Sequence, residues 1–191
     1  MRHEIHTIIF GFHMTFVTND RCFSPKTIDA GTFAMLSRCT LLKGQKTHDL
    51  GCGYGTVGVA CAKVVGAENV YMSDVDTNAL SIARENANRN DVPCVHIIHS
   101  DGYKTFDETG FDVILCNPPY HSDFNVAKHF IEKGFNRLNI GGRMFMVVRR
   151  LEWYKRKYIA IFGGVTIHRE EGGYFVLEAM KKDLKYANKK G

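Results

Sequence analysis

A glycine-rich run at residues 49–55, Asp-Leu-Gly-Cys-Gly-Tyr-Gly, constrains the fold of this chain more than any other feature. Residues 46–50 have the apolar character of a short buried strand, and residues 55–65 have the pattern of a helix. Glycines at such a junction permit a tight turn whose backbone passes close to a ligand, beside the free amides of the helix N-terminus. The run therefore predicts a Rossmann-like α/β fold with a ligand at this turn.

The rest of the chain continues the alternation of strands and helices. Parallel strands are expected at residues 46–50, 70–74, 94–99, 112–116 and 143–148, and helices at 32–42, 55–65, 78–88 and 124–138. Two strand-like runs joined at residues 171–173 predict a C-terminal antiparallel hairpin, and residues 4–18 around Gly11 predict an N-terminal one. The pattern predicts an α/β, doubly wound, mostly parallel sheet of seven strands, with the N-terminal hairpin beside it.

Length and composition indicate one globular domain that must carry out both binding and chemistry. The 191 residues are divided into a hairpin and turn extension (1–30) and a Rossmann-like core (31–191). Polar residues interrupt every apolar run near the N-terminus, so neither a secretory signal nor a membrane span is expected, and the location expected is cytoplasmic. The six cysteines lack the spacing of a zinc site, so we expect free thiols and no metal.

Acidic residues at the ends of two further strands are candidate cofactor ligands. Asp74 lies 19 positions after Gly55 and is expected to accept hydrogen bonds from both hydroxyls of a ribose. Asp76 is the alternative, although it fits better as the cap of the helix that follows. Asp101 is expected to accept from an adenine amino group, or else to start its loop as an Asx turn. Thr56 stands where the dinucleotide fingerprint requires glycine, which disfavours NAD.

The tetrapeptide Asn117-Pro118-Pro119-Tyr120 directly follows the fourth parallel strand, at the same edge of the sheet as the glycine-rich turn. The prolines stiffen the loop, so the Asn117 side-chain oxygen and the Pro118 carbonyl can accept from one NH2 group while Tyr120 stacks on its planar system. Such bonds favour a pyramidal nitrogen, aim its lone pair at a sulfonium methyl group and stabilise the developing positive charge. The motif predicts methyl transfer to an amide-like or aniline-like nitrogen, without a strong base.

With these motifs in order, the sequence resembles the "methyltransferase small" family and, within it, the ribosomal-RNA guanine-N2 methyltransferases. The resemblance covers nearly the whole chain, including residues 23–32, which are similar to the family pattern F-S-x-x-x-x-D-x-G-[ST]. It implies that Phe23, Asp29 and Thr32 help to form the cofactor or acceptor pocket, with helix capping by Asp29 or Thr32 as the alternative. His121 fits the polar position after the tetrapeptide, or is simply solvated.

The resemblance implies a class I fold, S-adenosyl-L-methionine as cofactor and RNA as substrate, with ribosomal RNA favoured. Catalytic roles are expected for Asn117, Pro118, Pro119 and Tyr120. Cofactor-binding roles are expected for Asp49, Gly51, Cys52, Gly53, Gly55, Asp74, Val75, Asp101, Gly102 and Asn117. Family members with assigned ribosomal sites commonly have an additional N-terminal domain that is not part of this sequence, so the target nucleotide stays open.

Other acceptors are compatible with the same motif. Adenine-N6 methylation of tRNA or DNA is chemically equivalent, and glutamine-N5 methylation of a release factor would suit the same oxygen pair. A binding module without catalysis would be expected to lose Asn117 or Asp74, and both are present. The net charge of +5 is compatible with a polyanionic partner without requiring one. Basic and aromatic residues at 149–158 predict either an RNA-binding face or a solvated helix.

Overall fold

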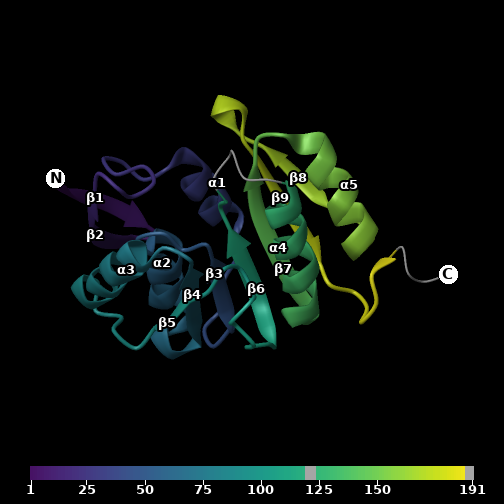
Figure 1. Ribbon diagram of the computed structural model, residues 1–191, viewed down its shortest axis with the longest axis horizontal. Helices are drawn as coiled ribbons and strands as arrows, with labels where there is room; N and C mark the ends of the chain where they lie inside the picture. The colour runs from purple at the N-terminus through teal and green to yellow at the C-terminus, as the bar shows by residue number, and fades with distance from the viewer. Residues whose placement is uncertain (119–123, 188–191) are drawn as a thin grey trace.

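The computed structural model describes residues 1–118 and 124–187. Its centre is a seven-stranded sheet with the strand order β5-β4-β3-β6-β7-β9-β8 (Figure 1). The strands are β3 (Thr47–Leu50), β4 (Val70–Asp74), β5 (His96–His99), β6 (Phe111–Cys116), β7 (Leu138–Val148), β8 (Thr166–Arg169) and β9 (Phe175–Met180). The first five are parallel, whereas β9 runs antiparallel between β7 and β8. The mixed, mostly parallel sheet and its C-terminal hairpin confirm the predicted fold class.

Helices cover both faces of this sheet and create two hydrophobic cores. The helices are α1 (Ala30–Arg38), α2 (Thr56–Val65), α3 (Thr77–Arg89), α4 (Phe124–Arg137) and α5 (Leu151–Phe162), with short 3₁₀ turns η1 (Ala67–Asn69) and η2 (Glu171–Gly173). Apolar residues of α1, α2 and α3 belong to one core, and those of α4 and α5 belong to the other. Strand β6 supplies Val113 and Leu115 to the first core and Ile114 and Cys116 to the second. This alternation explains why a strand buried on both faces is almost wholly apolar.

The predicted N-terminal hairpin is a separate two-stranded sheet of β1 (Arg2–Ile9) and β2 (Phe12–Asn19). It lies beside α3 (Figure 1), and two asparagines bond to the free edge of β2: Asn86 in α3 and Asn90, the C-cap residue after it. The Asn86 amide accepts from Val17 N at 2.7 Å and donates to Val17 O at 2.9 Å. The Asn90 amide makes the same pair with Thr15, at 3.0 and 2.9 Å. Two asparagines one helical turn apart thus replace a neighbouring strand.

Two expected boundaries were wrong by four residues or more. The first helix ends at Arg38, four residues before the predicted end, because Cys39 takes an extended backbone with φ −86° and ψ 121°. The fifth parallel strand begins at Leu138, directly after α4, and not at residue 143 as expected. Its pairing with β6 shifts register between Phe111, which pairs with Leu138, and Val113, which pairs with Arg143. Residues 151–162 form helix α5, which is not solvated on every side because Tyr154 and Tyr158 are buried; an RNA-binding face at residues 149–158 stays a prediction. Within residues 1–118 and 124–187, no helix is long and apolar enough to cross a membrane.

Candidate functional site

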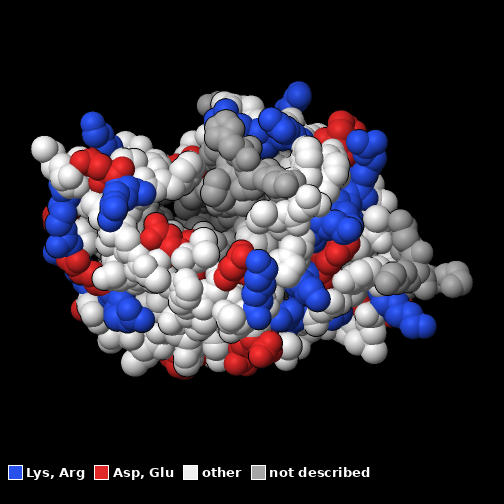
Figure 2. All heavy atoms as spheres, viewed as in Figure 1, with Lys and Arg blue, Asp and Glu red and all other residues white. Residues whose placement is uncertain are grey.

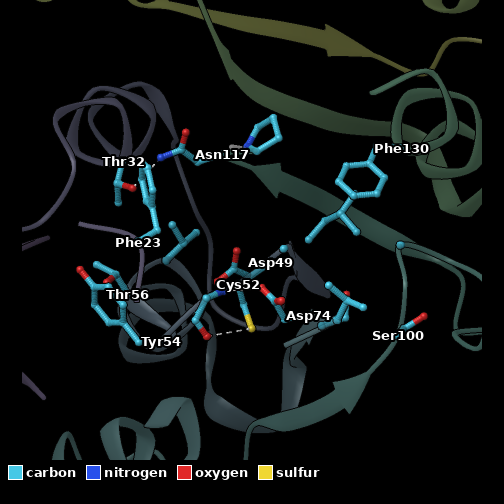
Figure 3. Close-up of a pocket in the computed structure, with 18 of the residues that line it drawn as sticks. Phe23, Thr32, Asp49, Cys52, Tyr54, Thr56, Asp74, Ser100, Asn117 and Phe130 are labelled. Carbon is cyan, nitrogen blue, oxygen red and sulfur yellow. Dashed lines mark hydrogen bonds between the residues drawn. The ribbon is translucent and has the colours of Figure 1, made fainter. Parts of the chain in front are cut away.

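A cavity of about 360 Å³ lies at the carboxyl ends of β3, β4 and β6 (Figure 3). Its walls come from the glycine-rich turn after β3, the ends of β4 and β5, the loop before α1, the loop after β6 and the first half of α4. In a parallel sheet these strand ends meet at one edge, where the backbone leaves the sheet and opens a crevice. Segments distant in the sequence therefore share one cavity.

The glycines of the turn have two different functions. Gly53 has φ +54° and open space where a side chain would begin, so the turn keeps a left-handed backbone beside the cavity. Gly55 packs inward instead, because a Cβ there would come within 2.7 Å of Met72 Cε. The backbone carbonyl of Ser73 connects the turn to β4, because it accepts hydrogen bonds from Gly51 N at 2.8 Å and Cys52 N at 3.0 Å. The turn is thus rigid, closely packed on the side that faces Met72, and open on the side that faces the cavity.

Asp49 lies in β3, beneath this turn. It is 2% exposed, and its Oδ2 accepts a hydrogen bond from Gly58 N in the first turn of α2 at 2.8 Å. Burial raises the pKa of Asp49 from 3.8 to about 7, although the Gly58 bond opposes this shift. A cationic group bound above the turn would favour the ionised form of this carboxyl.

Asp74, at the end of β4, lines the cavity and faces the glycine-rich turn (Figure 3). One carboxylate oxygen accepts from Gly53 N at 2.8 Å and the other from Asp76 N at 2.9 Å. A carboxylate accepts about four hydrogen bonds, so it retains capacity for the two hydroxyls of a ribose. Asp76 instead caps α3, since its Oδ1 accepts from Asn78 N at 2.8 Å. The capping expected of Asp76 is confirmed.

The adenine end predicted from sequence also lies in the cavity wall. Val75 is 60% exposed at the tip of β4, and Asp101 and Gly102 follow β5. Asp101 pairs with Lys104, which lowers the pKa of Asp101. Gly102 is required by packing, because a Cβ there would lie 2.8 Å from the Phe130 ring of α4. Phe130 thus closes this end of the cavity.

Asn117 enters the cavity from the end of β6, and two hydrogen bonds hold its amide. Its Nδ2 donates to Asp29 Oδ2 and to Thr32 Oγ1, each at 2.9 Å. Figure 3 shows the amide nitrogen directed toward Thr32. Asp29 also caps α1 by accepting from Thr32 N at 3.1 Å. Asp29 therefore caps α1 and also lines the cavity, while its part in binding a cofactor or an acceptor stays a prediction.

The remaining predicted residues are placed less completely. Pro118 is buried and lines the cavity, as does Phe23, which is 50% exposed. Pro119, Tyr120 and His121 lie outside the described residues. Among the described residues there is no group of three or more His, Cys, Asp and Glu that could hold a metal ion.

Sequence reasoning missed the contribution of α4. Val126 and Phe130 both line the cavity, one helical turn apart. The available signal was this four-residue spacing of apolar side chains, one of them the exposed Val126, on a helix that begins soon after the tetrapeptide. Thr56 and Val57 at the start of α2 also line the cavity, beside the open backbone of the turn.

The lining of the cavity fits a nucleoside carrying a small charged chain. Asp74 offers acceptors for a ribose, Phe130 and Val75 offer apolar surface for a base, and Gly53 leaves room above the turn. Beyond this part of the cavity, Asn117 provides an oriented amide within reach of a second molecule. The arrangement can hold a cofactor and an acceptor side by side.

Comparison with known proteins identifies the family of this chain. The family model of the methyltransferase small domain matches residues 13–178. The uncharacterized protein YbxB of Bacillus subtilis is 27% identical over 172 residues, covering 87% of this chain and 86% of YbxB. The ribosomal RNA small subunit methyltransferase C of Hahella chejuensis is 29% identical over 163 residues, or 83% of this chain. This chain matches less than half of that enzyme's length, 47%.

Solved structures share the fold. A 16S ribosomal RNA N2 guanine methyltransferase of Thermus thermophilus, in complex with S-adenosylmethionine and guanosine, superposes with a TM-score of 0.86 and 24% identity. The superposition covers 95% of this chain and 51% of that one. A methyltransferase of Pyrococcus furiosus gives a TM-score of 0.73 at 21% identity and covers 91% of both chains.

Proposed function

The chain belongs to the methyltransferase small domain family of S-adenosyl-L-methionine-dependent enzymes, and we propose that it methylates the exocyclic N2 amino group of a guanine in ribosomal RNA. The observation that carries the proposal is the meeting of Asp74 and Asn117 in one cavity. Asp74 suits the ribose of the cofactor, and Asn117 suits an amino group that lies beside it. Binding and chemistry are then adjacent at the carboxyl edge of the sheet.

In this proposal different residues of the cavity bind different parts of the cofactor. Asp74 accepts from the ribose hydroxyls, and Asp101, Gly102 and Val75 hold the adenine. The turn from Asp49 through Gly51, Cys52 and Gly53 to Gly55 accommodates the methionine part. When bound, the cofactor supplies an electrophilic methyl group on a positively charged sulfur.

Asn117 and the carbonyl of Pro118 act on the acceptor. An exocyclic amino nitrogen is a weak nucleophile because its lone pair is delocalised into the ring. Two oxygen acceptors on its two hydrogens favour a pyramidal nitrogen and stabilise the positive charge that develops there. With the cofactor bound, Asn117 and Pro118 would hold the nitrogen toward the methyl carbon. The sulfur would keep the electron pair of the broken bond, and the methylated nitrogen would lose a proton to water. Tyr120 is proposed to stack on the base.

Ribosomal RNA is favoured over other acceptors by the name of the Hahella chejuensis relative, a ribosomal RNA small subunit methyltransferase. The Thermus thermophilus neighbour was solved with guanosine bound. An RNA substrate also suits the basic side chains near α5, and Figure 2 shows more Lys and Arg than Asp and Glu over the half of the molecule covered by α4 and α5. Such an enzyme would work in the cytoplasm, on RNA outside the finished ribosome.

The test is nucleoside mass spectrometry of ribosomal and transfer RNA from cells with and without the gene. The proposal expects one N2-methylguanosine position in ribosomal RNA to become unmethylated when the gene is deleted. Loss of N6-methyladenosine instead would select the adenine alternative. Unchanged RNA together with a release factor that has lost its methylglutamine would reject RNA as the substrate.

A further inference from the structure

The cavity contains a hydrogen-bond arrangement that joins the loop before α1 to the catalytic amide. Asn117 Nδ2 has two hydrogens, and it lies 2.9 Å from both Asp29 Oδ2 and Thr32 Oγ1. Thr32 is 7% exposed and Asp29 is partly buried, so water competes weakly for these bonds. The partners lie 88 and 85 residues from Asn117 in the chain, and only the fold brings them together.

An asparagine amide has chemically opposite ends, and a half-turn of its last torsion exchanges them. In one orientation the oxygen accepts from the amino group of an acceptor, and in the other two NH2 groups would face each other. A carboxylate accepts hydrogen bonds and donates none, so Asp29 tolerates only the nitrogen of Asn117. The oxygen is thereby assigned to the opposite side of the amide.

We propose that Asp29 and Thr32 are positioning residues that hold the Asn117 amide with its oxygen toward the acceptor amino group. This role rests on the proposed N-methyl transfer. The Asp29 carboxylate has a second effect, because a negative charge behind the amide nitrogen polarises the amide and strengthens its oxygen as an acceptor. That oxygen then better stabilises the positive charge that develops on the acceptor nitrogen.

The same pair also couples substrate chemistry to helix α1, because Asp29 is its N-terminal cap and Thr32 lies in its first turn. Removal of Asp29 could therefore act through folding alone. Serine and asparagine cap helices about as well as aspartate, which allows the two roles to be separated. Asp29→Ser keeps the cap but removes both the charge and the reach toward Asn117, whereas Asp29→Ala removes the cap as well.

The experiment measures kcat and KM for methyl transfer to protein-free ribosomal RNA, together with cofactor affinity by calorimetry. Asp29→Ser is expected to lower kcat by about 10- to 100-fold with a cofactor Kd within about threefold of wild type. Thr32→Val is expected to lower kcat by about 10-fold, and Thr32→Ser, which restores a hydroxyl acceptor, to recover most of that loss. Ser37→Ala, an exposed change on the same helix, is the control for α1.

A double-mutant cycle decides whether Asp29 acts through Asn117. In an Asn117→Ala background the amide is gone, so adding Asp29→Ser is expected to change the residual rate by less than about twofold. An equal fall in both backgrounds would overturn the proposal, and so would a loss explained entirely by cofactor Kd. A wild-type kcat in Asp29→Ser would overturn it as well.

A second measurement does not depend on the acceptor. In protein labelled with ¹⁵N-asparagine, the Asn117 side-chain NH2 pair is identified by its absence in Asn117→Ala. Both protons are expected to be protected from exchange in wild type, and to lose protection in Asp29→Ser and Thr32→Val. Protection that is unchanged would contradict the arrangement. If wild type methylates a release factor and no RNA, the proposed substrate fails, and the same variants assayed on that protein still decide this inference.

Discussion

At the scale of single residues, carboxylates near the cavity have different roles because they have different hydrogen-bond partners. Asp74 accepts from the backbone of the glycine-rich turn and lines the cavity, while Asp76, two residues later, caps α3. Sequence spacing was enough to separate these two roles, because a strand tip and a helix start are both readable from local pattern. It was not enough to find the bond between Asn117 and Asp29, since the sequence contains no local signal for a contact across 88 residues.

Asp74→Ala is expected to weaken cofactor binding by about 2 to 4 kcal/mol, because charge-assisted bonds to the ribose are lost. Asp76→Ala is the matched control, which should cost about 1 kcal/mol of stability through the lost cap and leave affinity nearly unchanged. Calorimetry with S-adenosylmethionine measures affinity, and urea unfolding measures stability. Equal affinities for wild type and Asp74→Ala would remove the ribose role.

The raised pKa of Asp49 predicts that its contribution to the free energy of unfolding falls as pH rises. Its pKa is 3.8 in the unfolded reference and about 7 in the fold, with burial as the main cause. Between these two pH values the folded state holds a proton that the unfolded state releases. The contribution of Asp49 to the free energy of unfolding is therefore complete below about pH 4 and is lost as pH rises toward 7. The difference corresponds to about 4 kcal/mol as an order of magnitude. Asp49→Asn should therefore gain stability over wild type at about pH 8 and little at about pH 4.

Urea unfolding of both proteins from about pH 4 to about pH 8, without cofactor, measures this difference. A stability difference that is the same at both ends of the range would show that the pKa of Asp49 is not raised in the fold. The side-chain oxygen of the asparagine variant can still accept from Gly58 N, so loss of that bond does not confuse the comparison.

At the scale of elements, the sequence predicted strands and helices well where one pattern dominated. The almost wholly apolar β6 and the alanine-containing α3 were expected close to their true bounds. The end of α1 was not, because residues 39–42 continue an apolar pattern although the chain has already left the helix. The environment of helix α5 was ambiguous, because its local pattern contains two signals. Its charged residues indicate exposure to solvent, whereas Tyr158 is fully buried against the sheet.

Asn86 joins the N-terminal hairpin to the glycine-rich turn. This buried side chain bonds to Val17 N and O, and it also donates to Tyr54 O at 2.8 Å. Asn86→Ala would leave these buried groups unpaired and is expected to destabilise the protein by about 2 to 4 kcal/mol. Asn88→Ala, on the exposed face of α3, is the control and should change stability by less than about 0.5 kcal/mol. Similar urea midpoints for both variants would contradict the role of Asn86.

The end of β7 and the start of α5 are expected to contact RNA phosphates. Arg149 and Arg150 are exposed directly after β7, which is paired with the strand that precedes Asn117. Arg150 lies 5.9 Å from the centre of the Phe124 ring, which in turn packs on Trp153 at 4.6 Å. Arg150→Ala should raise KM for RNA several-fold and reduce the salt dependence of binding by about one phosphate contact, without changing cofactor affinity.

Lys185→Ala is the control for this prediction, because Lys185 is an exposed cation that is not among the residues lining the cavity. Filter binding at several salt concentrations compares the two variants. If Lys185→Ala weakens RNA binding as much as Arg150→Ala, net charge and not this surface determines affinity.

At the scale of the whole molecule, the sheet brings three segments of the cavity to one edge. The glycine-rich turn follows β3, Asp74, the proposed ribose ligand, ends β4, and Asn117, the proposed acceptor ligand, follows β6; these strands are neighbours in the sheet. The order of motifs along the chain predicted this edge, since parallel strands place their carboxyl ends together. The pattern of strands and helices does not fix where the loop before α1 folds back, so its place in the cavity wall was expected only from the family resemblance of residues 23–32.

The most direct measurement of the central claim is the identity and rate of the methylated product. Protein-free ribosomal RNA from cells lacking the gene is incubated with S-adenosylmethionine carrying a deuterated methyl group, and the RNA is digested for nucleoside mass spectrometry. Wild type is expected to form deuterated N2-methylguanosine, and Asn117→Ala to bind the cofactor normally but turn over about 10²- to 10³-fold more slowly. Deuterated N6-methyladenosine as the product, or an unchanged rate in Asn117→Ala, would contradict this account.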